Sequence, residues 1–209
     1  MYEFITHTGN AIKGKCYHDC SYCYMKKWGE QKPVRLDRGE LSVPLTNGNF
    51  IFVGSSCDMF ANEINPDWIA DVLDYCIASD NKFLWQTKNP EEFHHWNFPI
   101  ESVFCTTIET NRLYPDIMRN SPIPQERAKY MNRLNEKKYV TIEPIMDFDT
   151  DELFELIAMC KPKQVNIGAD SGNNNLPEPS FEKVMVLIEM LKGITTVHKK
   201  KNLNRLLTT

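Results

Sequence analysis

The chain has 209 residues with 42 % hydrophobic and 25 % charged content, which is typical of a globular protein and most simply of one domain with a substantial core. Its N-terminus has no basic segment followed by an apolar one, and no later run is long enough to cross a bilayer, so we expect a cytoplasmic protein with no membrane partner. The formal net charge of −4 excludes an overall electrostatic attraction to nucleic acid, while a local basic patch stays compatible with one.

The first predicted strand, residues 2–6, leads directly into a cysteine-rich loop over residues 14–24. The next stretch, residues 28–49, contains three glycines and two prolines and has no sustained apolar period. Long irregular connections of this kind are often functional flaps. A flap over the cysteine loop and an ordinary disordered excursion are both compatible with this stretch.

From residue 50 onward, strand and helix signals alternate, which is the pattern of parallel βα units. Each strand is a short run of apolar or β-branched residues, and the helices have an apolar face or a capping residue at their start. The predicted strands are residues 50–53, 83–87, 103–108, 139–142 and 164–167, and helices are predicted to begin near residues 66, 90, 125, 150 and 181. With the first strand there are about six units, fewer than the eight of a closed barrel, so we expect an α/β fold with mainly parallel strands.

Three cysteines in the loop, Cys16, Cys20 and Cys23, have C-x-x-x-C-x-x-C spacing. Thiolates in one short turn converge on one point when they hold a metal ion or an iron–sulfur cluster. The chain has seven cysteines, an odd number, and the other four are scattered singly, so a disulfide framework is a poor explanation and a reducing cytosol fits best. No local fourth ligand is present. A cubane cluster on three thiolates has one iron free for a ligand that is not protein.

Zinc is the alternative occupant of this loop, because zinc also binds three thiolates and one imidazole. His18 or His7 would then supply the imidazole. Zinc ribbons usually have a second close pair of Cys or His ligands, and the sequence has none. A non-catalytic zinc or iron–sulfur module is therefore the competing functional class, and it predicts bound metal without any further cofactor.

Polar side chains follow the predicted strands at their carboxyl ends, where the active sites of parallel barrels collect. Because side chains alternate along a strand, Thr107 and Glu109 share a face, and acidic groups can project together toward the mouth of the barrel. Buried like charges need a cation or hydrogen bonds to offset them. The strand-end residues are Ser55, Ser56, Asp58, Lys88, Thr107, Glu109, Glu143, Asn166 and Asp170.

The cysteine motif resembles that of the radical S-adenosylmethionine superfamily, including an aromatic residue, Tyr22, just before the third cysteine. The resemblance implies an open, TIM-like partial (β/α)6 barrel with a 4Fe–4S cluster on Cys16, Cys20 and Cys23. It implies that the amino and carboxylate groups of S-adenosylmethionine bind the open iron, with Tyr22 beside the adenine. It also implies reductive cleavage to a 5′-deoxyadenosyl radical that abstracts hydrogen from a substrate, with an electron donor such as a flavodoxin or ferredoxin.

Within that superfamily the chain is similar to the spore photoproduct lyase branch, a group of DNA-repair enzymes. The similar stretches are Cys23-Tyr24, residues 54–58, Thr87-Lys88 and residues 107–110. By this likeness Ser56 or Asp58, together with Lys88 and Thr107, helps to hold S-adenosylmethionine. Tyr24 is expected to relay a hydrogen atom.

The sequence as a whole is more similar to a poorly characterised set of phage-type radical proteins. The shared motifs are Thr-Lys-x-Pro-Glu, Ile-Glu-Pro and Gly-x-x-Ser-Gly, here residues 87–91, 142–144 and 168–172. This likeness implies a fold and cofactors but no particular substrate. We expect Glu109, Glu143 and Asp170 to complete the cofactor site, because a sulfonium, an ammonium group and ribose hydroxyls would offset their charge.

Three further features have two interpretations each. Cys57 lies two residues from the place of the hydrogen-donor cysteine of the lyase branch, so it is either a thiyl donor or a small buried hydrophobic residue. Arg127 is expected to be a solvated surface residue, with a ligand carboxylate or phosphate as the alternative. We expect a barrel domain over residues 1–192 and a basic C-terminal tail over residues 193–209; the tail makes nucleic acid a candidate substrate, unless it is simply solvated.

Overall fold

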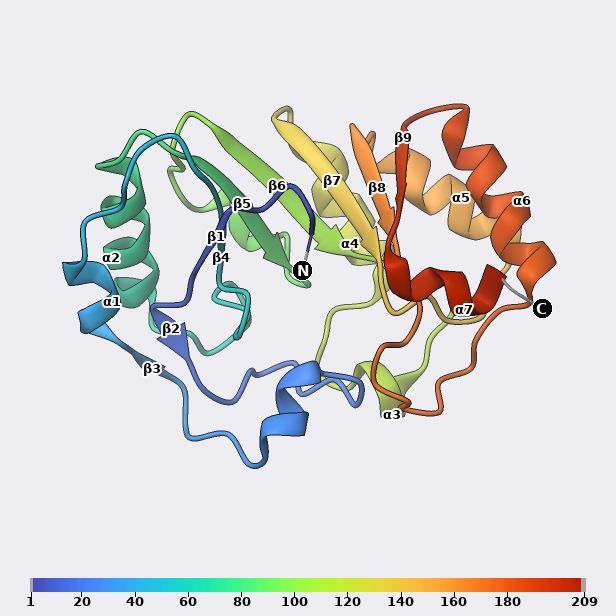
Figure 1. The fold of residues 1–209 in the computed structure, drawn as a ribbon, viewed down its shortest axis with the longest axis horizontal. Coiled ribbons are helices and arrows are strands. Elements are labelled where there is room, and N and C mark those ends of the chain that lie inside the picture. The colour runs from blue at the N-terminus through green and yellow to red at the C-terminus, as the bar shows by residue number, and fades with distance from the viewer. Residues whose placement is uncertain (1, 208–209) are drawn as a thin grey trace.

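The computed structural model describes residues 2–207, and its central element is a parallel sheet of seven strands. The strands are β1 (His7–Gly9), β4 (Phe50–Val53), β5 (Lys82–Thr87), β6 (Ser102–Thr107), β7 (Lys137–Ile142), β8 (Gln164–Ile167) and β9 (Thr196–Lys199). They pair in this order, so strand order follows chain order (Figure 1). The edge strands β1 and β9 are not paired with each other in the described part of the chain. The predicted α/β fold, an open partial barrel of parallel strands, is confirmed.

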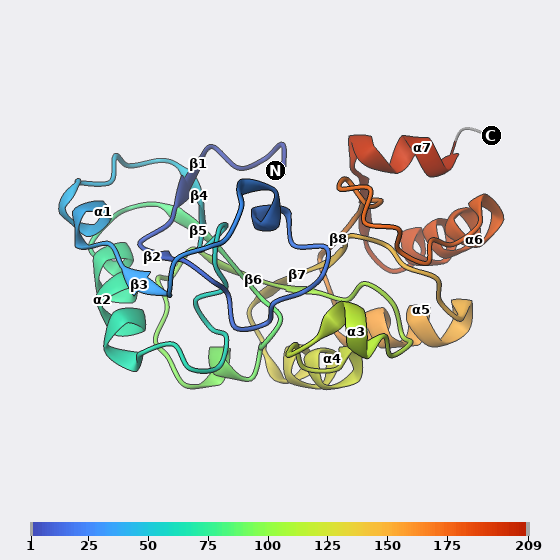
Figure 2. The ribbon, with the colours of Figure 1, turned by 90° about the horizontal axis from the view of Figure 1, so that it is seen from below.

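Four helices cover the outer face of the sheet (Figure 2). They are α2 (Pro66–Ile77), α4 (Pro124–Arg133), α5 (Thr150–Met159) and α6 (Phe181–Lys192). Two of them begin at caps that the sequence predicts: the Asn65 side chain accepts a hydrogen bond from the Asp67 amide (2.9 Å), and Ser180 accepts one from the Lys183 amide (3.4 Å). No helix within residues 2–207 is long and apolar enough to cross a membrane.

The remaining elements are short. They are β2 (Ile12–Lys13), β3 (Arg35–Leu36), α1 (Arg38–Ser42), α3 (Pro115–Met118), α7 (Asn204–Leu207) and the 3-10 helices η1 (Tyr24–Trp28), η2 (Glu92–His94) and η3 (Lys201–Leu203). The stretch 28–49 is thus not irregular throughout, because β3 pairs antiparallel with β2 and Asp37 caps α1 by accepting a hydrogen bond from the Gly39 amide at 3.1 Å. Its role as a flap stays a prediction.

Side chains of the sheet alternate between two cores. Phe83 and Trp85 pack outward against the helices, and Leu84 between them packs inward; all three are completely buried. The N-terminal segment lies over the inner face, where the Tyr2 hydroxyl donates to Oε1 of Gln86 (2.7 Å) and lies 2.5 Å from Oγ1 of Thr141. This segment therefore covers part of the inner face of the sheet.

Two strand predictions are wrong. Residues 2–6 are not the first strand, because Tyr2 and its neighbours pack across the inner face and the chain joins the sheet only at His7. Gln164–Ile167 is not the last strand either, since β9 pairs with it and Val197 lies opposite Val165. β9, with the sequence Thr-Val-His-Lys, lies at an exposed edge of the sheet and has only one apolar residue. The alternation of apolar and polar residues that predicts a strand is therefore weak here. The last strand of the sheet therefore falls within residues 193–209, the segment expected to be a basic tail.

Candidate active site

The cysteine loop lies at the carboxyl ends of the parallel strands, toward the lower end of the sheet in Figure 1. A backbone contact with α3 fixes its position, since the Ser21 amide donates to the Ile117 carbonyl at 2.9 Å. Cys20 is buried, and its Sγ lies 3.2 Å from Oγ of Ser121. The loop is therefore held against the segment that follows β6.

The loop thiols influence one another and a fourth thiol. Burial raises the pKa of Cys23, and negative charge on Cys20 and Cys16 raises it further. The neighbouring Cys57 thiol lowers the pKa of Cys16 to about 6, although burial opposes this. Cys57, one of the two predicted catalytic residues, therefore lies in contact with the first cysteine of the motif.

The donor set of the loop, three thiolates, suits an iron–sulfur cluster and, with an imidazole, a zinc ion. Each thiolate of a cluster binds a different iron atom, so three thiolates spread over one loop are suitable ligands. A zinc site instead needs its ligands arranged around one ion. No group of three or more Cys, His, Asp or Glu side chains in residues 2–207 is arranged in that way. The expected convergence of the thiolates on one point is thus not confirmed.

Asp58 connects the cysteine loop with the ends of two strands. Its Oδ2 accepts hydrogen bonds from Nε2 of His18 (2.9 Å), Oγ1 of Thr87 (2.9 Å) and the Lys88 amide (2.8 Å). Burial opposes ionisation of this carboxyl, but its hydrogen bond with His18 and the other donors outweigh burial, so its pKa lies below the ordinary value. Asp58 therefore ties the loop to β4 and β5, and Nδ1 of His18 is buried without a hydrogen-bond partner among the described residues.

A buried ionic network joins the loop to β5, β6 and α4. Glu109 is completely buried, and its Oε1 accepts hydrogen bonds from the Lys88 ammonium and the Tyr22 hydroxyl. Its Oε2 lies 2.7 Å from Nη1 of Arg127. Burial opposes ionisation of Glu109, but the positive charges of Arg127 and Lys88 outweigh it and hold the pKa of this carboxyl well below its usual range. The structure thus brings together three predicted site residues, Tyr22, Lys88 and Glu109.

Arg127 is not the solvated surface residue that we expected. Its side chain is completely buried, with Nη1 donating to the Thr107 carbonyl (2.8 Å) and Nε to the Pro122 carbonyl (2.6 Å). Its Nη2 is buried without a hydrogen-bond partner in residues 2–207. The sequence did contain a signal for this position, because Arg127 lies four residues before the buried Met131 and so on the apolar face of α4.

Tyr24 and Ser56 lie near the cysteine loop. The Tyr24 hydroxyl donates to the Ser55 carbonyl at 2.8 Å, and 48 % of this residue is exposed. The Ser56 amide donates to Oδ1 of Asn10 at 2.9 Å, and the Ser55 hydroxyl donates to the same oxygen at 3.0 Å. Asn10 was not predicted, because the first strand was expected at residues 2–6, whereas β1 ends at Gly9 and Asn10 follows it directly.

The side chains of Thr107 and Glu143 do not contact Glu109 or its cationic partners. Oγ1 of Thr107 accepts a hydrogen bond from Nε2 of Gln86 at 3.1 Å. Glu143 follows β7 and is held by the C-terminal segment, since Lys200 forms an ion pair with it and Nδ2 of Asn202 donates to its Oε1 at 2.8 Å. The segment after β9 therefore contributes directly to this end of the sheet.

Asp170 organises the loop that follows β8. Its carboxylate accepts hydrogen bonds from the Gly172 amide (2.8 Å) and from the amide and side chain of Asn174 (both 2.6 Å). Nη2 of Arg205 donates to the Asp170 carbonyl at 2.8 Å and pairs with Glu178. Burial opposes ionisation of Asp170, and its amide donors outweigh this, so its pKa lies below the ordinary value.

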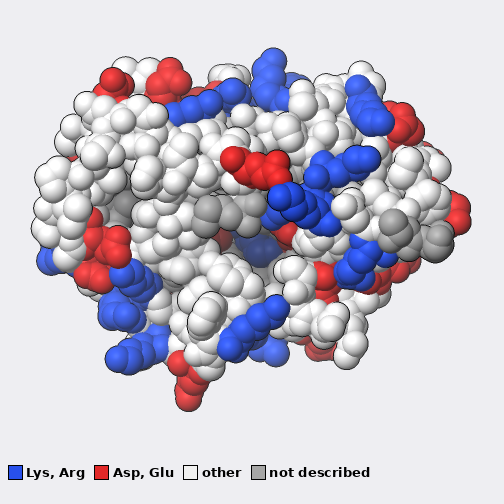
Figure 3. Space-filling view, in the orientation of Figure 1, with Lys and Arg blue, Asp and Glu red and all other residues white. Residues whose placement is uncertain are grey.

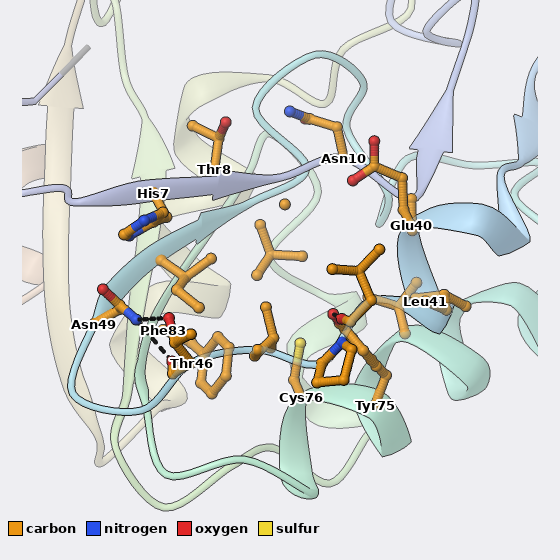
Figure 4. Close-up of a pocket in the computed structure, with 18 residues that line it drawn as sticks. His7, Thr8, Asn10, Glu40, Leu41, Thr46, Asn49, Tyr75, Cys76 and Phe83 are labelled. Carbon is orange, nitrogen blue, oxygen red and sulfur yellow. Dashed lines mark hydrogen bonds between the residues drawn. The ribbon is translucent and has the colours of Figure 1, made fainter.

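A separate cavity of about 230 Å³ lies at the β1–β4 edge of the sheet, under the segment that follows α1. Figure 4 shows His7 and Thr8 of β1 on one side of it and Tyr75 and Cys76 of α2 on the other. Most of its lining is apolar, and of the predicted site residues only His7, from the zinc alternative, lines it. This cavity therefore belongs to the packing between the sheet edge and α2, away from the cysteine loop.

The chain was compared with known proteins. No protein-family model and no curated protein matches it in sequence. It is similar to the solved structure of a spore photoproduct lyase variant with bound AdoMet and dinucleoside spore photoproduct, at 12 % identity and a TM-score of 0.57, with 90 % of this chain and 61 % of the lyase covered. It is also similar to SuiB of Streptococcus suis bound to the precursor peptide SuiA, at 10 % identity and a TM-score of 0.60, with 96 % and 50 % covered.

A further similar structure is SuiB bound to S-adenosylmethionine, at 12 % identity and a TM-score of 0.57, with 94 % of this chain and 51 % of SuiB covered. The chain thus spans about half to three fifths of the length of these proteins. The lyase and SuiB have both been solved with S-adenosylmethionine bound, and the predicted resemblance is confirmed at the level of the fold.

Proposed function

We propose that this chain is a radical S-adenosylmethionine enzyme with a 4Fe–4S cluster on Cys16, Cys20 and Cys23. The observation that carries the proposal is the position of the three-cysteine loop, at the carboxyl ends of the strands and in contact with the buried Lys88–Glu109 pair through Tyr22. Its fold is that of enzymes solved with S-adenosylmethionine bound. When bound, the cluster supplies the electron that cleaves S-adenosylmethionine reductively to the 5′-deoxyadenosyl radical, which abstracts hydrogen from a substrate.

The protein residues around the loop bind and orient the cofactor. The Lys88 ammonium suits the cofactor carboxylate, and the Glu109 carboxylate suits its ammonium or ribose hydroxyl groups. Arg127 keeps Glu109 ionised, because its positive charge lies 2.7 Å from a carboxylate that is completely buried. Tyr22 is the proposed neighbour of the adenine, and Ser56, Asp58, Thr107, Glu143 and Asp170 complete the proposed cofactor site.

Two residues are proposed for hydrogen transfer. Tyr24 is half exposed at the start of η1, directly after Cys23, so it can face both the cofactor and a substrate. Cys57 contacts Cys16 and offers a thiol hydrogen close to the cluster loop. An external electron donor such as a flavodoxin or ferredoxin would reduce the cluster.

The test is anaerobic purification with iron and sulfide analysis, followed by reduction with dithionite in the presence of S-adenosylmethionine and chromatography of 5′-deoxyadenosine. We expect cluster-dependent 5′-deoxyadenosine from the wild type and neither iron nor product from Cys16→Ala. The matched control is Cys76→Ala, a buried cysteine of α2 outside the loop, which should keep both. Zinc in place of iron with no cofactor binding, or full activity of Cys16→Ala, would instead make the chain a non-catalytic metal module.

A further inference from the structure

The Asp58 carboxylate is fully occupied by donors from the protein itself. Its Oδ1 accepts a hydrogen bond from the Phe60 amide at 3.1 Å, and its Oδ2 accepts the three hydrogen bonds that come from His18 and from the end of β5. A carboxylate has about four lone-pair sites, so no acceptor position is left for a ligand. Asp58 therefore contributes to the proposed cofactor site without touching the cofactor, and what it brings to the site is its negative charge.

This charge lies in the interior. The Asp58 side chain is 12 % exposed. Burial raises the pKa of its carboxyl, but the hydrogen bond with His18 and the other donors outweigh burial, so the carboxyl is ionised at neutral pH. Figure 3 shows acidic and basic side chains spread over one face of the molecule, where water and salt screen them. A buried charge is screened much less, so Asp58 acts more strongly on its surroundings than such surface charges do.

Asp58 lies beside Cys16, the first cysteine of the motif. It directly follows Cys57 in the chain. Its partner His18 lies two residues from both Cys16 and Cys20, at a distance of 2.9 Å from Nε2 to Oδ2. The pKa of the Cys16 thiol is lowered by Cys57 and raised by burial; the negative charge of Asp58 raises it further, and His18 lowers it. Asp58 and His18 therefore have opposite electrostatic effects at a proposed cluster ligand.

We propose that the buried charge of Asp58 lowers the reduction potential of the cluster, and that His18 moderates this effect. This inference rests on the proposed function and deepens it. Reduction adds one electron to the cluster, and a fixed negative charge that is poorly screened opposes this electron. A lower potential makes the reduced cluster a stronger reductant for the cofactor. The N–H of His18 offsets part of the negative charge, so the two residues act on the potential in opposite directions.

The test is the midpoint potential of the reconstituted full chain, measured by redox titration with electron paramagnetic resonance of the reduced cluster. Asp58→Asn removes the charge and should shift the midpoint to a more positive value. His18→Leu leaves the charge without one of its donors and should shift the midpoint to a more negative value. Both variants break the same hydrogen bond, so a merely structural role of that bond predicts shifts in the same direction.

Two controls separate the charge from other effects. His18→Gln keeps an N–H donor at the place of Nε2 but has no equivalent of Nδ1, which is buried without a partner in residues 2–207, and it should keep the wild-type midpoint. Asp74→Asn removes the same charge at an exposed position of α2 and should also keep it. If Asp58→Asn does not bind a cluster, the difference between His18→Leu and His18→Gln decides the question.

Three results would overturn the proposal: equal midpoints in all the variants, shifts of the same sign in Asp58→Asn and His18→Leu, or equal shifts in His18→Leu and His18→Gln. Iron and sulfide content is measured separately. If the wild type binds a cluster and one of these results is found, only the role of Asp58 and His18 fails. If the wild type contains no iron, the proposed function fails too, so the two failures are distinguishable.

Discussion

Nη1 of Arg127 lies 2.7 Å from Oε2 of Glu109, and both side chains are completely buried. Such a pair loses hydration free energy on burial, and its members offset this loss for each other. Lys88 and the Thr107 carbonyl add further compensation. Removing either charge leaves the other buried with fewer partners, so substitution of either residue should destabilise the fold.

Arg127→Met should lower the free energy of unfolding by about 3–5 kcal/mol, because it leaves the Glu109 carboxylate buried with less positive charge beside it. Urea denaturation of the wild type and the variant measures the difference. Arg133→Met, at an exposed position of the same helix, is the control and should change stability by no more than about 0.5 kcal/mol. Equal effects of the two substitutions would show that the buried pair does not stabilise the fold.

Stability should fall in acid partly through Glu109. Its pKa is lower in the folded protein than in the unfolded chain, so the contribution is fully present above the unfolded value of about 4.3 and is lost as the pH falls below it. Between about pH 6 and about pH 3.5, Glu109→Gln should therefore lose less unfolding free energy than the wild type. Glu189→Gln, at a largely exposed residue, should follow the wild type. An equal loss of unfolding free energy in all three proteins would show that protonation of Glu109 does not contribute to the loss of stability in acid.

Lys88→Gln should weaken the binding of S-adenosylmethionine about tenfold or more, since a charge-assisted hydrogen bond to the cofactor carboxylate would be lost. Equilibrium dialysis with the cofactor measures this without relying on turnover. Lys82→Gln removes a lysine at the opposite end of the same strand and should leave the affinity unchanged. If both variants bind as the wild type does, Lys88 is not part of the cofactor site.

Cys57→Ser should leave iron and sulfide content at wild-type level, because three thiolates of the loop suffice to hold a cluster with one open iron. Visible absorption after anaerobic reconstitution measures the cluster. Cys20→Ser makes the same replacement of sulfur by oxygen, but at a proposed cluster ligand, and it should lose the cluster. A loss of iron in Cys57→Ser would make Cys57 a fourth ligand and remove the open iron from the proposal.

Local patterns in the sequence were enough to predict much of the fold. Apolar periodicity and caps such as Asn65 and Ser180 depend on neighbouring residues alone, so the alternating strands and helices from residue 50 onward could be identified. The cysteine spacing is equally local, and it identified the loop around which the candidate site is built. The weakly apolar β9 and the N-terminal segment were misjudged, because both take their conformation from long-range packing.

Only the tertiary structure decided which of the strand-end residues meet. Tyr22 and Glu109 are 87 residues apart in the chain and share a hydrogen bond, while Glu143 is held by Lys200 rather than by the loop network. The burial of Arg127 was decided in the same way: its charge is stable inside because the folding of α4 over β6 brings it to the Glu109 carboxylate. Charge pairing in a protein interior depends on distances that no local pattern contains, and the chemistry of this site depends on that pairing.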